Sequence, residues 1–167
     1  MSQSSTTNSL LIDDVLLDRL LDQAAASARR RKNHNFHATD SHPCQRLLNA
    51  ILEDSYIQPH RHLDPAKDET LVMLRGRLGI LFFDAAGAIT ERLIIDAMGE
   101  SCGLTIPSGT YHTLVPLAPR NVIFETKAGP YVPHRPDELA PFAPPEGDRW
   151  CSAQLGAWKR LFDDADF

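Results

Sequence analysis

The chain has 167 residues, of which 43% are hydrophobic and 23% charged, as is typical of a soluble globular protein with one well-buried core. A net charge of −5 argues against non-specific binding to nucleic acid, which needs a basic surface. The longest apolar run, residues 78–83, is far shorter than the roughly 20 residues of a membrane-spanning helix, so no membrane association is expected.

The amino-terminal end and the cysteines indicate the cellular compartment. Residues 1–9 are polar and low in complexity, which predicts a disordered tail without a secretory signal. Cys44, Cys102 and Cys151 are widely spaced and form no Cys-x-x-Cys pair, which is typical of a reducing compartment. We therefore expect a cytoplasmic protein.

An amphipathic helix is predicted over residues 10–32. Apolar residues recur at helical spacing from Leu17 to Ala28, and Asp13 or Asp14 is placed to cap the helix. The cations of Arg29–Lys32 then meet the negative end of the helix dipole. The apolar stripe packs either on the barrel or on a second copy of the chain in a homodimer.

Short strands account for most of the remaining chain. A strand over residues 45–52 has mixed faces, so that Arg46 or Asn49 reaches a cavity unless the strand lies at a sheet edge. Further strands are predicted over residues 56–62, 69–74, 78–83, 89–95, 104–106 and 121–127. Prolines exclude regular sheet after residue 132, so residues 134–167 are predicted to wrap the surface and end in a short helix.

The clearest chemistry lies in two histidine-containing stretches. On a strand, His60 and His62 project from the same face, because side chains two positions apart are neighbours. His112 follows a Pro-x-Gly turn and lies opposite this pair when the sheet closes into a barrel. Three imidazoles and a carboxylate suit a divalent transition metal and leave coordination positions open.

The fourth ligand is expected on the strand that follows the histidine pair. Alternation places Glu69 on one face with Leu71 and Met73, where a carboxylate is costly to bury unless it is paired or bound to a metal. Asp64 and Asp68 are the alternatives. Gln58 shares the face of the histidine pair and Thr110 that of His112, so both are candidate cavity residues.

These residues resemble the two sequence motifs of the cupin superfamily. The matching parts are His60-x-His62, Glu69 followed after six residues by Gly76, and Pro107-x-Gly109-x-x-His112. The resemblance implies a mainly β fold, a double-stranded β-helix or jelly-roll barrel over residues 33–133, with flanking helices in the same domain. It also implies a metal held by His60, His62, Glu69 and His112.

The chain departs from the cupin pattern in two places. The gap between His62 and Glu69 is lengthened to six residues, which puts Lys67 where the glutamate is usual. The second motif has Ser101 and Pro116 in place of a glycine and an asparagine. These are not ligand positions, so the departures concern loop shape more than metal binding.

Longer stretches, residues 31–37, 45–50, 55–62 (any residue at position 58) and 129–131, resemble the WbuC family of cupin-fold metalloproteins. That family is associated with bacterial O-antigen and other surface-polysaccharide gene clusters, which implies a saccharide ligand. The resemblance also implies that residues 33–37 lie over the barrel mouth and contact substrate. The alternative is a structural clasp between helix and barrel.

We expect metal-dependent isomerase, epimerase or lyase chemistry on a sugar or nucleotide-sugar, with Lys67 or Tyr56 moving a proton. Iron, manganese, nickel, cobalt and zinc all accept such ligands. A saccharide-binding protein without turnover, an iron-dependent dioxygenase and a metal-free cupin are the alternatives. The predicted substrate contacts are Arg31, Asn33, His34, Asn35, Arg46, Gln58 and Thr110, with Arg31 suited to an anionic group.

Overall fold

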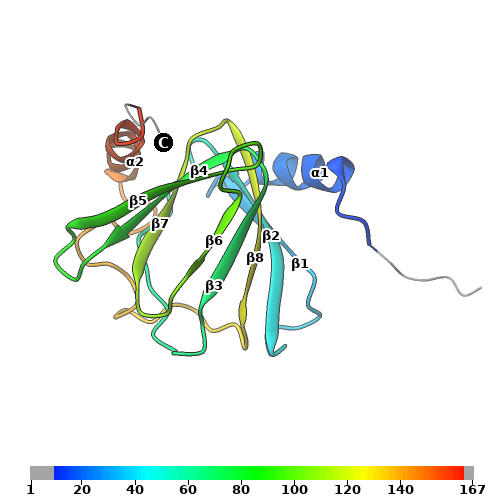
Figure 1. Ribbon diagram of the computed structural model, residues 1–167, viewed down its shortest axis with the longest axis horizontal. Coiled ribbons are helices and arrows are strands. Elements are labelled where there is room, and N and C mark those ends of the chain that lie inside the picture. The colour runs from blue at the N-terminus through cyan, green and yellow to red at the C-terminus, as the bar shows by residue number, and fades with distance from the viewer. Residues whose placement is uncertain (1–9, 164–167) are drawn as a thin grey trace, which may run out of the picture.

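The computed structural model describes residues 10–163, so the predicted disordered tail, residues 1–9, lies outside the described residues. Two antiparallel sheets face each other, and a helix lies on the outer side of each (Figure 1). In chain order the elements are α1 (Asp14–Ala25), β1 (Arg31–Asn35), β2 (Cys44–Leu52), β3 (Glu69–Arg75), β4 (Arg77–Phe83), β5 (Ile89–Asp96), β6 (Gly103–Ile106), β7 (Tyr111–Pro116), β8 (Arg120–Ala128) and α2 (Cys151–Arg160). None of the described helices is both long and apolar enough to cross a membrane.

The larger sheet has the strand order β1-β2-β8-β3-β6, and the smaller sheet has the order β5-β4-β7. Neighbours such as β2 and β8 are far apart in the sequence, so the chain crosses between the sheets repeatedly, as in a jelly roll. The predicted mainly β jelly-roll barrel with an amino-terminal and a carboxy-terminal helix is confirmed.

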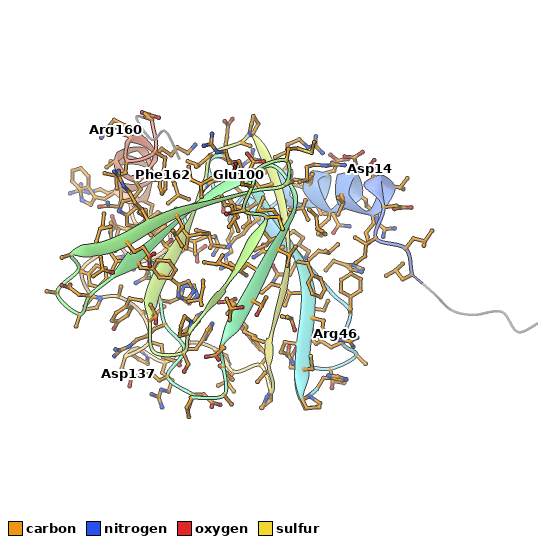
Figure 2. All side chains as sticks on the ribbon, in the orientation of Figure 1. Asp14, Arg46, Glu100, Asp137, Arg160 and Phe162 are labelled. Carbon is orange, nitrogen blue, oxygen red and sulfur yellow. The ribbon has the colours of Figure 1, made fainter. Side chains whose placement is uncertain are left out.

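The space between the sheets is filled by apolar side chains from alternate strand positions (Figure 2). The larger sheet contributes Ile51, Leu71, Met73 and Ile123, and the smaller sheet contributes Leu78, Ile80, Phe82, Ile95 and Leu114. This core fixes the distance between the sheets and leaves polar positions only where the alternation brings them inward.

Each helix covers the outer face of one sheet. The apolar stripe of α1, which includes Leu17 and Leu21, packs on Leu48 of β2 and Val122 of β8, while Asp13 caps the helix by accepting from the Leu16 N–H. The stripe of α1 thus packs on the barrel, the first of the two predicted alternatives, and a homodimer stays a prediction.

On the smaller sheet, Trp158 of α2 packs on Leu81 and Val115. Phe162, labelled beside α2 in Figure 2, lies over Gly79 of β4. The predicted carboxy-terminal helix therefore forms and serves as the cover of this sheet.

The amino-terminal helix is shorter than the predicted range 10–32. It ends at Ala25, and Arg30 adopts φ 56°, which turns the chain into β1. The Leu52 N–H donates to the Arg30 carbonyl, so strand pairing outweighs the helical tendency of this run. The guanidinium of Arg30 still donates to the carbonyl of Ala25 at the helix end.

The predicted strand over residues 56–62 is also corrected. Pro59 has no N–H and interrupts regular pairing. His60 forms isolated bridges to His112 and Leu139 instead of a ladder. The bridge to His112 is reciprocal, with N–H to carbonyl distances of 3.0 and 2.9 Å, and it places the two histidines side by side.

Candidate metal centre and its cavity

Three predicted ligands from three parts of the chain meet between the sheets. His60 comes from the irregular segment before β3, Glu69 is the first residue of β3, and His112 belongs to β7. One potential ligand atom from each lies within 4.8 Å of the other two. Glu69 is 5% and His112 is 2% exposed, so two of the three groups are shielded from bulk water.

Backbone hydrogen bonds orient two of the imidazoles. His60 Nδ1 lies 3.0 Å from the Gln58 carbonyl and His112 Nδ1 lies 2.9 Å from the Thr110 carbonyl. A carbonyl only accepts, so each Nδ1 carries a proton, and Nε2 is the ring atom left to bind a metal. Burial and the neighbouring His112 hold the pKa of His60 well below its usual range, which keeps this ring neutral.

The Glu69 carboxylate divides its two oxygens between the histidines and a lysine. Oε2 lies 3.4 Å from His62 Nε2 and 3.3 Å from His112 Nε2. Oε1 lies 3.1 Å from the Nζ of Lys127. The oxygen that faces the imidazoles is therefore the one available to a cation, and Lys127 fixes the other.

Lys127 also pairs with a second buried carboxylate, Glu125, at 2.8 Å. Burial of the Glu69 carboxyl would raise its pKa, but the Lys127 charge and the histidine hydrogen bonds outweigh burial, so this pKa lies well below its usual range. Burial and the adjacent Glu69 carboxylate raise the pKa of Glu125 to about 7. The cluster thus contains several hydrogen-bond acceptors, and its cationic side chain is that of Lys127.

Strand register explains this arrangement. Lys127 of β8 is directly opposite Glu69 of β3 and Gln45 of β2, and Glu125 is opposite Leu71. Sequence reasoning missed Lys127 and Glu125, although alternation over the predicted strand 121–127 places both on one face. The available signal was that these two charged residues share a strand face with the apolar Ile123, which predicts that they point into the barrel.

A fourth histidine completes the cluster from the proline-rich segment. The ring of His134 lies 4.5 Å from that of His60 and 5.2 Å from that of His62, between ring centroids. No regular spacing connects His134 to the other histidines, so sequence reasoning did not single it out as a ligand. Its position depends on how residues 129–140 cross the barrel.

The cluster opens on a cavity of about 540 Å³. Its walls include His60, Glu69, His112, Glu125 and Lys127. The other polar lining residues include Arg29, Arg31, Lys32, Asn33, Asn49, Gln58 and Glu146. A cavity of this size and polarity suits a small hydrophilic molecule.

Some predicted substrate residues line cavities. Arg31, Asn33 and Gln58 line the main cavity, and Asn35 lines a neighbouring one of about 160 Å³. Asn49, and not Arg46, is the residue of β2 that reaches the main cavity. Residues 33–35 of the segment predicted as lid or clasp belong to the edge strand β1, which pairs with β2 and contributes Arg31, Asn33 and Asn35 to the cavity walls.

Three other predicted contacts lie elsewhere. His34 faces outward on β1, its ring 5.1 Å from that of Phe36. Arg46 lies on the outer side of the larger sheet, as Figure 2 shows, and its guanidinium donates to the Phe36 carbonyl. Thr110 is not among the cavity-lining residues described, and its carbonyl serves to orient His112.

The two predicted proton-transfer residues are also displaced from the main cavity. The Tyr56 hydroxyl donates to the Pro144 carbonyl at 2.7 Å, and its ring stacks on Trp158. Burial raises the pKa of Tyr56, so the phenol stays protonated at neutral pH. Lys67 donates to the Pro130 carbonyl and lines smaller pockets beside His62. Lys127 is the lysine at the cluster.

The donor set fits a divalent transition metal. It combines imidazole nitrogens with one carboxylate oxygen, which is the ligand chemistry of such ions. Of the three candidate carboxylates, Glu69 is the one brought to the histidines. Asp64 and Asp68 are exposed and accept backbone N–H groups of Ala66 and Ser108.

Comparison with solved structures agrees with the fold. A Bacillus halodurans protein shares 16% identity and a TM-score of 0.51, covering 80% of this chain and 90% of its own. KdgF from a Halomonas species has 15% identity, a TM-score of 0.47 and coverages of 64% and 83%. A protein described as belonging to the cupin superfamily, from Desulfitobacterium hafniense, has 13% identity, a TM-score of 0.46 and coverages of 59% and 76%.

No curated protein matches the sequence. The sequence model of one family, described as "Domain of unknown function (DUF6016)", matches residues 12–95. The match runs from α1 to β5 and includes three of the predicted metal ligands, His60, His62 and Glu69. Because it covers half of the chain, this protein belongs to the DUF6016 family.

Proposed function

We propose that this protein is a metal-dependent cupin that binds a sugar or nucleotide-sugar and converts it by isomerase, epimerase or lyase chemistry. The observation that carries the proposal is the cluster of His60, Glu69 and His112, which opens on a polar cavity of about 540 Å³. Ligand atoms grouped beside a cavity of substrate size are the arrangement expected of a catalytic rather than a structural metal site.

The chain's own residues have separable roles in this proposal. His60, His112 and Glu69 hold the metal, with His62 as the fourth ligand. A bound divalent cation would polarise a carbonyl or hydroxyl oxygen of the substrate. Lys127 and Glu125, in place of Lys67 and Tyr56, are the charged groups placed to hydrogen-bond a substrate oxygen beside the cluster.

A role in bacterial O-antigen or lipopolysaccharide biosynthesis is the finer part of the proposal. Its support is the resemblance of residues 31–37, 45–50 and 55–62 to the WbuC family, and the matching positions include Arg31, Asn33 and Asn49 of the cavity wall. Residues with the resemblance thus coincide with residues that would contact a ligand.

The test compares metal-loaded with chelator-treated protein. Each is incubated with a panel of sugars, sugar acids and nucleotide-sugars and followed by proton NMR and by thermal shift. We expect new product resonances only with the metal-loaded protein. Stabilisation without product would identify a saccharide-binding protein, and oxygen consumption with iron would identify a dioxygenase. A panel without effect on spectrum or melting temperature would overturn the proposal.

A further inference from the structure

A second charged cluster lies in the same cavity, and the metal site does not account for it. The carboxylate of Glu146 lies between two arginines that also line the cavity. Arg29 contacts both oxygens, at 2.7 Å to Oε1 and 3.0 Å to Oε2. Arg31 contacts Oε2 at 2.7 Å. Two guanidinium groups therefore converge on one carboxylate.

The two sides of this contact differ in how firmly they are held. Arg31 belongs to β1, its side chain is 10% exposed, and its Nη1 donates to the Tyr56 carbonyl at 2.9 Å. Its position is thus fixed without Glu146. The Glu146 side chain is 33% exposed and lies outside regular structure, between Pro145 and Gly147. The Arg31 half of the site is therefore fixed, and the carboxylate that fills the site is accessible to solvent.

Hydrogen bonds through Gln58 connect Glu146 to the metal cluster. The Glu146 N–H donates to Gln58 Oε1 at 3.3 Å, and the Gln58 carbonyl orients His60 through Nδ1. The arginine pair and the metal cluster line the same cavity of about 540 Å³, so a ligand that fills this cavity would contact both.

We propose that Arg29 and Arg31 form the binding site for a carboxylate of the ligand, and that Glu146 fills this site until the ligand displaces it. Two guanidinium groups that engage both oxygens of a carboxylate already show the geometry that a ligand carboxylate would take. The exchange leaves no arginine unpaired, since one carboxylate replaces another and Glu146 moves into solvent. The inference rests on the proposed function and narrows its substrate class to sugar acids.

The test measures binding of D-glucuronate by calorimetry to protein of known metal content. In Glu146→Gln the competing charge is gone while the side-chain shape is kept. If the site is open in a tenth or less of the molecules, affinity for D-glucuronate should rise about tenfold or more, because the apparent dissociation constant scales with the open fraction. Affinity for neutral D-glucose should stay unchanged.

Two further variants complete the test, one expected to weaken binding and one expected to leave it unchanged. Arg29→Gln, at a side chain that is 63% exposed, should fold normally and weaken D-glucuronate binding. Asp54→Asn is the matched control, because it breaks a similar carboxylate pair with Arg30, which is not among the cavity-lining residues described. It should leave the affinity as in the unaltered protein.

The outcomes separate this inference from the proposed function. Unchanged or weaker D-glucuronate binding in Glu146→Gln, with normal metal content, would overturn the carboxylate site and leave the metal-dependent function standing. Stronger binding of glucose 6-phosphate than of D-glucuronate would overturn the assignment to a carboxylate. Absence of metal from the unaltered protein would contradict the proposed function itself.

Discussion

The two sheets of the barrel face the same interior but present different chemistry to it. The inner face of the smaller sheet is apolar along β4, with Leu78, Ile80 and Phe82, and contributes His112 at its edge strand. The inner face of the larger sheet is charged at one end, where Glu69 and Lys127 lie opposite each other, and apolar over the rest of its length. The smaller sheet serves as scaffold, and the larger sheet carries most of the polar groups of the site.

This difference between the sheets indicates where a small barrel tolerates buried charges. Glu69, Glu125 and Lys127 lie on neighbouring strands, so each charge has a partner within the sheet. An isolated charge in the apolar half would have none and would be costly to bury. Substitutions in the larger and in the smaller sheet should therefore destabilise the protein for different reasons.

The largest effect is expected from removing the cation of the larger sheet. In metal-free protein, Lys127→Ala leaves two buried carboxylates facing each other, and we expect the free energy of unfolding to fall by about 3–5 kcal/mol. Urea denaturation in the presence of a chelator measures it. Lys67→Ala, at a lysine that donates to the Pro130 carbonyl, is the control and should cost far less. Equal losses would show that the buried ion pairs are not what stabilises this half.

A cavity in the smaller sheet should destabilise without touching the chemistry. Ile80 is fully buried in the core, so Ile80→Ala should lower the free energy of unfolding by about 3 kcal/mol through lost packing. Metal content per folded molecule should stay unchanged. A parallel loss of metal would mean that packing at Ile80 is needed to hold the metal ligands in place.

A smaller effect is expected where α2 covers the smaller sheet. A Cβ at Gly79 would come within 2.4 Å of the Phe162 ring. Gly79→Ala should therefore cost about 1–3 kcal/mol through overpacking. Because the clash is with one side chain, the cost should be much smaller in a Phe162→Ala background. Additive costs in the double variant would show that the ring already moves freely.

The smallest effect concerns the pH dependence of the Glu146 contact. Burial would raise the pKa of Glu146, but the hydrogen bonds from Arg29 and Arg31 outweigh it and lower that pKa. The contact thus adds stability above the unfolded-state pKa, and the gain is lost as pH falls through the folded-state value. The melting-temperature gap between the unaltered protein and Glu146→Gln should narrow from pH 7 to pH 3.5. A constant gap would contradict this linkage.

Local pattern predicted much of this fold. Alternating strands and the parity that selects Glu69 over Asp68 depend on near neighbours in sequence, and the structure agrees with them. The irregular path at Pro59 and the strand at Arg31–Asn35 depend on pairing with distant segments. Helical spacing alone could not reveal that β1 is needed at the edge of β2.

The site was predictable to a similar extent. The histidines and Glu69 follow from spacing, whereas Lys127 reaches Glu69 through cross-strand register, which a single sequence does not specify. Glu146 and His134 come from a segment without periodicity, so no pattern places them. Tyr56 and Lys67 are predicted as proton-transfer residues because they are reactive groups near the histidine motif. In the structure their side chains donate hydrogen bonds to the backbone carbonyls of Pro144 and Pro130.

The choice of carboxylate ligand has its own test. Glu69→Gln should weaken metal binding, because the neutral amide oxygen replaces the charged Oε2 that faces His62 and His112. Asp68→Asn is the matched control, since that carboxylate accepts from the Ser108 N–H at the surface. Loss of metal in Asp68→Asn with retention in Glu69→Gln would contradict the assignment.

Elemental analysis of purified protein shows whether the histidine and glutamate cluster binds a metal. The unaltered protein and the control His42→Ala, whose ring bonds the Cys44 backbone, should carry about one divalent transition metal per chain, the stoichiometry of a single cluster of this kind. His60→Ala and His112→Ala should carry almost none while remaining folded. Unchanged metal occupancy in both variants would contradict the account.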